Sequence, residues 1–508
     1  MSLKNKTNRV TQMKPENKKN SRAIEKDIVI IGTGFGGLGM AIKLKDAGND
    51  DFVILEKGAS SGGCWRENRY PGAACDVPSL LYSFSFEPKT NWSRSYAGQE
   101  EIESYLHHCE KKYGLTEHIQ FDTEVASAQF NEQQGRWLLT TVAGKQISAR
   151  IFISACGQLS QPAMPNIDGM ENFAGKVMHS ARWDQDYDLT HKNVAVIGTG
   201  ASAIQFVPEV AKLASKVHVL QRSAAYVFPK PDRAYSTLEH ALFKYVPFLQ
   251  KAWRLGIYVD HEVRVLGFTS LQFMMNRAKK QCANYLNKII KDPELREKLT
   301  PNYSMGCKRI LFSNDYLPTF NQQHVSLETT AIDHIQADGI VLKDGRTLKV
   351  DTIIYGTGFK ATEFLTPIKV TGLEGKVLNE EWHKGAEAYL GITVKDFPNF
   401  YMLYGPNTNL GHNSIVYMLE SQIQYTLKAV AALQASNTKY LNIREGKQAL
   451  FNDKLQSKLK DTVWQKGCES WYKNDAGKNT VNWPDFTFKY RHKTRSINLK
   501  DYHVVKQA

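Results

Sequence analysis

Two segments of the chain repeat the same order of strand, glycine turn, helix and strand. The first begins at Lys26 as KDIVIIGTGFGG and continues through LGMAIKLKDAG to DFVILEK. The second begins at Lys192 and reads KNVAVIGTGASAIQFVPEVAKLASKVHVLQRS. A buried apolar run followed by glycines and a helix is typical of a parallel strand that opens a dinucleotide-binding unit. The sequence therefore predicts an α/β fold with two Rossmann-like dinucleotide-binding domains.

The glycines of the first unit have the spacing that a bound pyrophosphate requires. In Gly32-Thr33-Gly34-Phe-Gly-Gly37 the first glycine makes the turn, the second admits the phosphates, and the third lets helix and strand pack closely. Glu56 stands 24 residues beyond Gly32, at the end of the second strand, where a carboxylate accepts hydrogen bonds from ribose hydroxyls. We expect this turn to bind a dinucleotide.

The second unit has the same spacing but the opposite charge. Its expected nucleotide contacts are Gly198, Thr199, Gly200, Ala201, Ser202 and Ala203. The residue 24 positions beyond Gly198 is Arg222, which is followed by Ser223. A carboxylate there would repel a 2′-phosphate, whereas a guanidinium and a hydroxyl can bind it, so the second site favours NADPH over NADH.

The two sites together imply hydride transfer from NADPH to a second bound cofactor, and a flavin, FAD, is the usual acceptor. Two further strands, IFISACGQLSQPAMP and DTIIYGTGF, are expected to cross between domains. The inference is an FAD-binding domain at 27–165 and 341–508, interrupted by an NADP-binding domain at 166–340. Within the latter, about 236–299 favours helices, and its aromatic residues, Phe273 among them, are expected to be core.

Composition narrows the class of protein. Of the 508 residues, 42% are hydrophobic and 23% charged, with no apolar run long enough to span a membrane and no secretory signal, so a cytoplasmic enzyme is expected. Residues 1–26 hold eight lysines and arginines against two glutamates, about 6 of the net charge of +14, and are expected to form a disordered arm. No nucleic-acid motif accompanies this charge.

The cysteines show neither the even count nor the spacing of a disulfide framework or a metal site. There are seven of them, and they are interpreted as reduced thiols: Cys64, Cys75, Cys109, Cys156, Cys282, Cys307 and Cys468. We therefore predict no metal site.

Two longer motifs suggest a family. Residues 62–76, GGCWRENRYPGAACD, resemble the fingerprint GGxWxxNRYPGxxCD of Type I Baeyer–Villiger monooxygenases, which are class B flavoprotein monooxygenases. Residues 173–184, FAGKVMHSARWD, resemble the second signature of that family, FxGxxxHxxxW(P/D), and lie just before the second nucleotide unit. The resemblance extends from about Lys26 to at least Leu419.

The resemblance implies roles for particular residues. Arg309 matches the arginine that lies over the flavin and stabilises the negative peroxyflavin and the anionic adduct with a carbonyl, and Asp76 matches the carboxylate that holds it in place. A permanent cation aimed at developing charge in a dry site acts as an oxyanion hole does. Lys308 resembles an additional contact to the 2′-phosphate.

Other matched positions concern the cofactors. Trp65, Tyr82 and Val125 match residues that line the flavin, and Gln158 matches one near the nicotinamide. His179, in the second signature, is expected to couple cofactor binding to domain movement rather than to transfer protons.

The resemblance implies an NADPH- and oxygen-dependent enzyme that converts ketones to esters or lactones and also oxidises sulfides. Three alternatives stay open. One is a flavin-containing monooxygenase that acts mainly on sulfur or nitrogen. The others are a flavin disulfide reductase, which would need two closely spaced cysteines after the first unit, and a non-catalytic NADPH-binding sensor.

Overall fold

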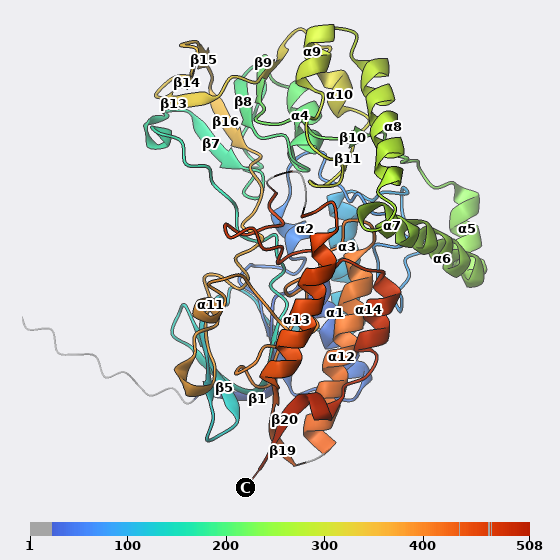
Figure 1. Ribbon diagram of the computed structural model, residues 1–508, viewed down its shortest axis with the longest axis vertical. Helices are drawn as coiled ribbons and strands as arrows, with labels where there is room; N and C mark the ends of the chain where they lie inside the picture. The colour runs from blue at the N-terminus through green and yellow to red at the C-terminus, as the bar shows by residue number, and fades with distance from the viewer. Residues whose placement is uncertain (1–22, 436, 466–467, 469, 508) are drawn as a thin grey trace, which may run out of the picture.

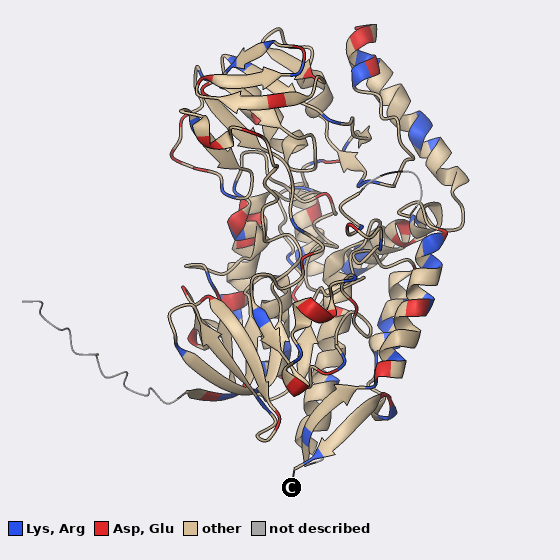
Figure 2. Ribbon diagram, turned by 60° about the vertical axis from the view of Figure 1, so that its left-hand side comes forward, with Lys and Arg blue, Asp and Glu red and all other residues tan. Residues whose placement is uncertain are grey.

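The computed structural model describes residues 23–435, 437–465, 468 and 470–507, which form two parts stacked along the long axis of the molecule (Figure 1). Most of the expected basic arm, residues 1–22, lies outside the described residues. Its last residues do not belong to an arm, because the first strand already begins at Ile24. Basic and acidic residues are interspersed over the elements of both parts (Figure 2).

The first part is built on a sheet whose strands run in the order β17-β4-β5-β6-β1-β2-β3, with β18 paired to β6. Its strands are β1 Ile24–Ile31, β2 Phe52–Leu55, β3 Ile119–Gln120, β4 Val125–Asn131, β5 Arg136–Thr141, β6 Gln146–Ser154, β17 Lys369–Thr371 and β18 Phe400–Met402. β1 lies between parallel neighbours and its second half is fully buried, which explains its continuous apolar sequence. The chain returns to this sheet after residue 368.

Helices cover this sheet, and a separate antiparallel pair of strands lies near the C-terminus. The helices are α1 Phe35–Asp46, α2 Cys64–Glu67, α3 Gln99–Lys112, α11 Leu378–Glu381, α12 Ile415–Ala435, α13 Glu445–Lys460 and α14 Thr487–Thr494. The antiparallel pair joins β19 Thr438–Ile443 to β20 Tyr502–Lys506. α1 packs against α12, so the first nucleotide turn is supported by a helix from the far end of the chain.

The second part holds a parallel sheet in the order β12-β9-β8-β16-β7. Its elements are β7 Lys176–His179, β8 Asn193–Ile197, α4 Ala203–Ala211, β9 Lys216–Leu220, α10 Tyr316–Thr319, β12 Val325–Glu328 and β16 Thr352–Tyr355. Beside it lie the pair β10 Val227–Phe228 and β11 Leu311–Phe312, and the meander β13 Ile332–Gln336, β14 Gly339–Leu342 and β15 Thr347–Lys349. These two sheets confirm the α/β class.

The domain boundary expected at residue 340 differs from the structure. Residue 340 falls inside β14, and β16 pairs with both β7 and β8 of the second sheet. The second part therefore continues to about residue 355. The strand DTIIY belongs to it because its apolar side chains complete that sheet on both faces.

The expected helical segment is present but serves both parts. It comprises α5 Thr237–Tyr245, α6 Pro247–Val263, α7 Val265–Phe268, α8 Phe273–Ile289 and α9 Pro293–Lys298. α8 packs against β10 and α10 of the second part. α6 instead bonds to the first part, with Gln250 Nε2 donating to the carbonyl of Lys89 at 2.7 Å. The segment is thus a bridge rather than an excursion of one domain.

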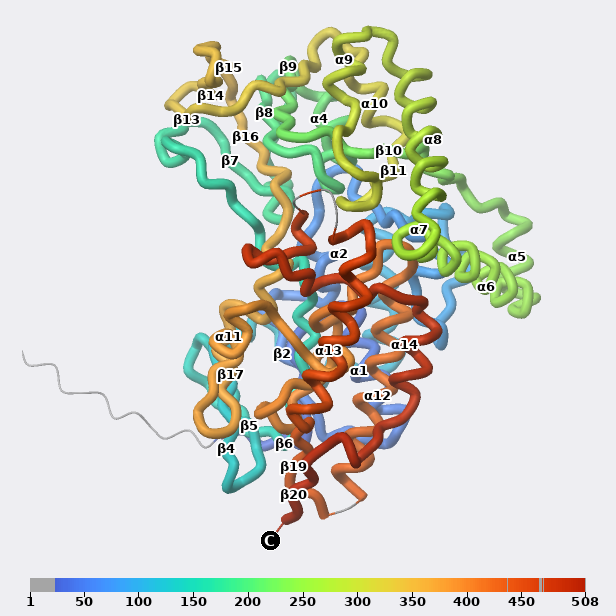
Figure 3. Tube along the Cα trace, viewed as in Figure 1, coloured from blue at the N-terminus to red at the C-terminus, as the bar shows by residue number. Residues whose placement is uncertain are grey.

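Two chain crossings, after β6 and after β16, connect the parts (Figure 3). Backbone hydrogen bonds join the two crossings. The amide of Ala163 donates to the carbonyl of Gly358 at 2.9 Å, and the amide of Lys360 donates to the carbonyl of Gln161 at 3.0 Å. The crossings therefore form a short two-stranded ribbon between the two sheets.

Candidate active site

Both glycine turns face one cavity of about 1790 Å³ that lies between the two parts. Gly32 follows the carboxyl end of β1 and Gly198 follows the carboxyl end of β8. Ligands of open parallel sheets bind at this end of the strands. With its volume of about 1790 Å³, the cavity is large enough for both expected nucleotides and a substrate.

Close backbone contacts explain the glycines of the first turn. Gly32 has φ +99°, and a Cβ on Gly37 would lie 1.8 Å from the carbonyl oxygen of Gly32. Gly34 faces Gly63 of the first fingerprint, whose α-carbon would lie 3.6 Å from an added Cβ. Backbone amides of the turn and of the start of α1 are thus open to a pyrophosphate.

Glu56 is buried beside this turn, but it is already engaged. Its Oε2 accepts from the amide and hydroxyl of Thr33 at 2.9 and 2.6 Å, and its Oε1 lies 2.8 Å from Arg66 Nη1. Arg66 was not predicted to belong to the site, because it occupies a variable position of the fingerprint. It positions the carboxylate that is expected to bind ribose, and it adds a cation beside the first glycine turn.

The residues predicted to line the flavin all border the cavity. Trp65 Nε1 donates to the Tyr82 hydroxyl at 3.2 Å, and their rings meet edge to face with centroids 5.7 Å apart. Val125, at the start of β4, is buried and also borders the cavity. The three side chains give one wall of the site a flat and largely apolar surface.

The second turn accommodates its variant residue through a neighbouring glycine. Ala203 stands where the fingerprint usually has a third glycine, and an added Cβ on Gly356 would lie 3.1 Å from the Cβ of Ala203. The space for the alanine thus comes from Gly356, directly after β16. The turn residues that border the cavity are Gly198, Thr199, Gly200, Ala201 and Ser202.

A group of hydrogen-bond donors stands next to the second turn. Lys308 Nζ donates to Ser223 Oγ at 2.9 Å, and Thr199 Oγ1 donates to the carbonyl of Ser223 at 3.2 Å. Arg222, adjacent to Ser223, is exposed and borders the cavity. The structure therefore brings three residues together. Arg222 and Ser223 follow β9, and Lys308 lies in the segment before β11.

Arg309 and Asp76 meet at the junction of the two parts. Arg309 Nη2 lies 2.5 Å from Asp76 Oδ2, and both residues border the cavity. The adjacent carboxylate raises the pKa of Arg309, so the guanidinium stays charged. About 40% of the arginine side chain remains exposed, and one described ion pair uses only part of its five N–H donors.

Gln158 is buried at the first crossing and has spare bonding capacity. Its Nε2 donates to the carbonyls of Tyr404 and Gly405 at 3.2 Å, whereas its Oε1 has no partner among the described residues. A buried acceptor without a donor is costly unless a ligand supplies one. Gln158 can therefore accept from a carboxamide in the cavity.

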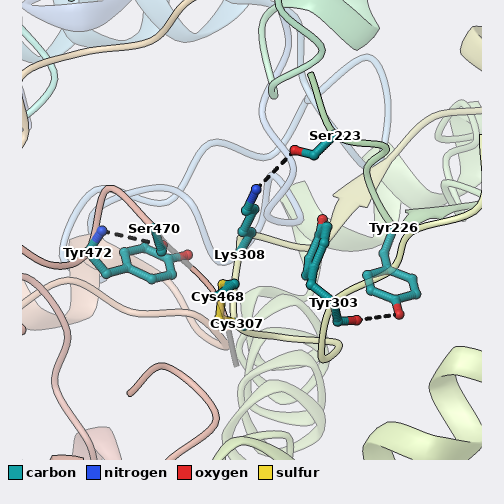
Figure 4. Close-up of a disulfide and its surroundings, with 8 residues drawn as sticks. All are labelled: Ser223, Tyr226, Tyr303, Cys307, Lys308, Cys468, Ser470 and Tyr472. Carbon is teal, nitrogen blue, oxygen red and sulfur yellow. Dashed lines mark hydrogen bonds between the residues drawn. A yellow bond between two sulfur atoms is a disulfide. The ribbon is translucent and has the colours of Figure 1, made fainter. Parts of the chain in front are cut away.

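Cys307 and Cys468 form a disulfide, which corrects the expectation that all cysteines are reduced (Figure 4). Their α-carbons are 6.2 Å apart although 161 residues separate them, so no local spacing could indicate the pair. The bond joins the residue before Lys308 to the segment that carries Tyr472. Tyr472 borders the cavity, and burial raises the pKa of its hydroxyl to about 12.

Two of the free cysteines that border the cavity, Cys64 and Cys75, do not form a reactive pair. Cys64 is exposed, whereas Cys75 is buried, and burial raises the pKa of the Cys75 thiol well above its ordinary value. Disulfide exchange needs an accessible thiolate at neutral pH. The site therefore lacks the chemistry of a flavin disulfide reductase at these positions.

A buried carboxylate that the sequence did not indicate connects α6 to the cavity wall. Glu262 accepts from Asn413 Nδ2 at 2.6 Å and from the amide of Thr487, at the start of α14, at 2.5 Å. His412, beside Asn413, is buried without a hydrogen-bond partner among the described residues, and burial lowers its pKa to about 3. Both His412 and Asn413 border the cavity.

The structure places two other residues named in the sequence, and the coupling role expected of His179 stays a prediction. His179 and Trp183 lie apart from the residues that line the large cavity; His179 pairs with Tyr355 in the second sheet, and the Trp183 ring packs on Phe206. Phe273, expected in the core, is 67% exposed and borders the cavity. It is exposed because the start of α8 lies at the edge of the bridge between the parts.

The residues present fit FAD and NADP. The turns are tight, with no room for a Cβ at Gly32, Gly37 or Gly198. The donors of Arg222, Ser223 and Lys308 match a 2′-phosphate, and Gln158 offers an unpaired acceptor.

Comparison with known proteins agrees with this geometry. A family described as pyridine nucleotide-disulphide oxidoreductase matches residues 29–290. A Baeyer–Villiger monooxygenase of Pseudomonas aeruginosa is 47% identical over 480 residues, covering 94% of this chain and 91% of that protein. A cyclohexanone monooxygenase of Rhodococcus bound to NADP⁺ has a TM-score of 0.87 at 25% identity, covering 96% of this chain and all of that one.

A further solved structure, OTEMO in complex with FAD and NADP, also has a TM-score of 0.87 at 25% identity and covers 95% of this chain and 100% of that one. The chain is therefore an FAD- and NADP-dependent oxidoreductase that belongs to the Baeyer–Villiger monooxygenase family.

Proposed function

We propose that this protein uses NADPH and molecular oxygen to convert ketones to esters or lactones, and that it does so in the cytoplasm. The observation that carries the proposal is the ion pair of Arg309 with Asp76, which borders the cavity between the two nucleotide turns. The reaction of a disulfide reductase, or NADPH binding by a sensor, does not require a fixed cation at this place. Ketone oxidation does require one, because the ketone oxygen gains negative charge during the reaction and a cation stabilises it.

The residues of the second part would hold NADPH. Arg222, Ser223 and Lys308 would bind its 2′-phosphate, and Gln158 Oε1 would accept from the nicotinamide carboxamide. The first turn, with Glu56, would hold FAD, which when bound supplies the reaction of reduced flavin with oxygen and the transfer of one oxygen atom.

Arg309 would act on the substrate itself. Its charge is permanent, and the free donors of its guanidinium would bind the ketone oxygen and stabilise the charge that develops there. Asp76 fixes one edge of the guanidinium, so little reorganisation is needed when the substrate enters. Trp65 and Tyr82 would exclude water from the same wall.

Oxidation of sulfides is proposed as a second activity, because the large and mostly apolar cavity can also take in an apolar sulfide. An enzyme that acts mainly on sulfur or nitrogen is the rival. It would not need Arg309, since sulfur gains no negative oxygen that a cation must stabilise. The two possibilities therefore differ in their dependence on one residue.

The test is product analysis with isotopic oxygen. Purified enzyme receives NADPH, labelled oxygen and panels of cyclic, linear and aryl ketones and sulfides, and mass spectrometry identifies the products. We expect esters or lactones that carry one labelled oxygen atom. NADPH consumption that yields only hydrogen peroxide, or only sulfoxides, across the whole panel would refute the ketone reaction.

A further inference from the structure

The helix α6 presents its polar side chains to the protein. Gln250 Nε2 donates to the carbonyl of Lys89 at 2.7 Å, and Arg254 Nη2 donates to the carbonyl of Ser83 at 3.0 Å. Tyr258 shares a hydrogen bond of 3.0 Å with a threonine of α14. These contacts hold one face of the helix against the first part by polar groups, whereas a surface helix normally buries an apolar face.

The opposite face of α6 is apolar and open to solvent. Phe248 is 73% exposed, Leu255 60% and Val259 50%, and their spacing of seven and four residues puts them on one side of the helix. A helix with its apolar face outward lacks the burial that usually drives its docking. The sequence of α6 is therefore that of a helix whose exposed apolar face contacts another apolar surface.

The neighbouring helix extends this face. α5 packs against α6, with the rings of Phe243 and Trp253 edge to face at 5.9 Å. In Figure 1 the two helices project together from one side of the molecule. We define the arm surface by six of the exposed apolar side chains of α5 and α6: Leu238, Tyr245, Phe248, Trp253, Leu255 and Val259. Scattered exposed apolar residues are ordinary, but so many on two neighbouring helices mark an interaction site.

The free charges around the arm surface are positive. Lys244 and Lys251 are exposed and have no carboxylate within ion-pair distance among the described residues, whereas the acids Glu239 and Asp260 are each paired with an arginine at 2.5–2.6 Å. α8, which continues from the arm, carries basic but no acidic residues. The arm surface thus combines apolar side chains with unneutralised positive charge.

We propose that the arm surface docks on an anionic lipid surface. Aromatic residues with lysines beside them are the side chains that lie at the boundary between lipid headgroups and acyl chains. A second copy of the chain is the less favoured partner, because a two-fold contact through this face would bring the lysines of one copy against those of the other. Docking is peripheral: none of the described helices has both the length and the apolar character of a membrane span.

The arm also adjoins the opening of the active-site cavity. Phe273 is exposed and borders the cavity, as do Arg264 at the end of α6 and Met274. A ketone dissolved in the lipid would meet these residues first. Docking thus specifies the substrate class as lipid-soluble ketones, and this extension rests on the proposed ketone oxidation.

Vesicle flotation tests the docking without any reaction. The full-length holoenzyme is mixed with phosphatidylcholine vesicles, with or without phosphatidylglycerol. We expect it to float with the anionic vesicles and to be released by high salt. The triple variant Phe248→Ser, Leu255→Ser, Val259→Ser should lose this partitioning by more than about ten-fold, because three apolar side chains no longer enter the lipid. The variant Lys244→Glu, Lys251→Glu should lose the preference for anionic vesicles.

A matched control uses exposed apolar residues far from the arm. The variant Val142→Ser, Leu450→Ser removes side chains that are 67% and 51% exposed, and it should float as the wild type does. Retained flavin and unchanged NADPH oxidation in all variants show that they are folded. Wild-type protein that fails to float, or a triple variant that floats equally well, would overturn the docking. A dimer that the triple substitution dissociates, without flotation, would replace the lipid by a second copy.

The substrate class has its own measurement. Anionic vesicles should raise the rate with a long-chain ketone and leave that with a short water-soluble ketone unchanged, and the triple variant should lose this difference. An equal vesicle effect on both ketones would refute delivery from the lipid. If neither ketone reacts while flotation persists, the ketone reaction fails and the docking stands.

Discussion

Arg309 Nη2 lies 2.5 Å from Asp76 Oδ2, although the two residues are 233 positions apart and belong to different parts of the molecule. The pair joins the first fingerprint to the segment that also carries Lys308, which bonds to Ser223 beside the second turn. The expected NADP site and the expected reaction site are therefore connected by two consecutive residues. A shift of the second part relative to the first would move both together.

Replacing Arg309 separates cofactor binding from oxygen transfer. We expect Arg309→Ala to keep FAD and to be reduced by NADPH, but to form ester at a rate lower by about 10²–10³-fold, the usual cost of one lost oxyanion donor. Product formation is measured beside NADPH consumption. Arg94→Ala removes an exposed arginine paired with Asp232 outside the cavity and should leave the ester yield unchanged. Full ester formation by Arg309→Ala would exclude the arginine from the reaction.

Arg222 should determine the preference for NADPH. In Arg222→Ala we expect the Michaelis constant for NADPH to rise about ten-fold or more and that for NADH to change little, since a charge-assisted contact contributes about 1.5–3 kcal/mol. Lys308 would retain part of the preference. Arg346→Ala, which removes an exposed arginine of the same part away from the cavity, is the control. An unchanged ratio of the two constants would contradict the assignment.

The disulfide predicts a thiol count. Denatured, unreduced enzyme should show five reactive thiols, and prior reduction should expose all seven. Cys468→Ser should give the same count with and without reductant, and its loss of the cross-link should lower the free energy of unfolding by about 2–4 kcal/mol. Cys282→Ser, at a buried free cysteine, should instead lower both counts by one. Seven reactive thiols without reductant would disprove the bond.

Buried His412 predicts acid sensitivity. Its pKa of about 3 in the folded protein lies below the ordinary value of 6.5. Between these values the unfolded chain binds a proton that the folded protein does not. The stability contributed by the neutral imidazole is therefore complete above pH 6.5 and falls, by up to about 1.4 kcal/mol per pH unit, as the pH decreases through this window.

Thermal unfolding at pH 7 and pH 5 checks this effect. His412→Leu removes the proton-binding group from a buried position, so its melting temperature should fall less between the two pH values than that of the wild type. His492→Leu, at an exposed position, should fall as much as the wild type does. Equal falls in the wild type and His412→Leu would show that another group is responsible.

Much of the site could be predicted because its residues are set by local spacing. Glu56 and Arg222 stand at a fixed offset from their glycines, and in the structure both border the cavity. Arg66, which bonds to Glu56, gave no signal, because its position in the fingerprint accepts any residue. Glu262 gave none either, since its partners Asn413 and Thr487 come from distant segments of the chain.

The wrong predictions, like the residues that gave no signal, concern features that depend on contacts between distant segments of the chain. The strand DTIIY was placed beyond the domain boundary, because neither its composition nor its length tells which sheet it joins; that depends on pairing with β8, far earlier in the chain. The partner of Cys307 lies 161 residues away. Phe273 was expected in the core since an aromatic side chain in a helix is usually buried. For the same reason, the sequence did not predict that the apolar side chains of α6 would face the solvent.

The ribbon formed by the two crossings has a mechanical consequence. A domain on a single flexible linker can rotate about any axis. Here two chain segments connect the parts side by side, and the backbone hydrogen bond between Ala163 and Gly358 holds them together. The helical bridge α5–α8 and the disulfide between Cys307 and Cys468 add further links, so the second part is restrained against the first at several places and not by one flexible connection.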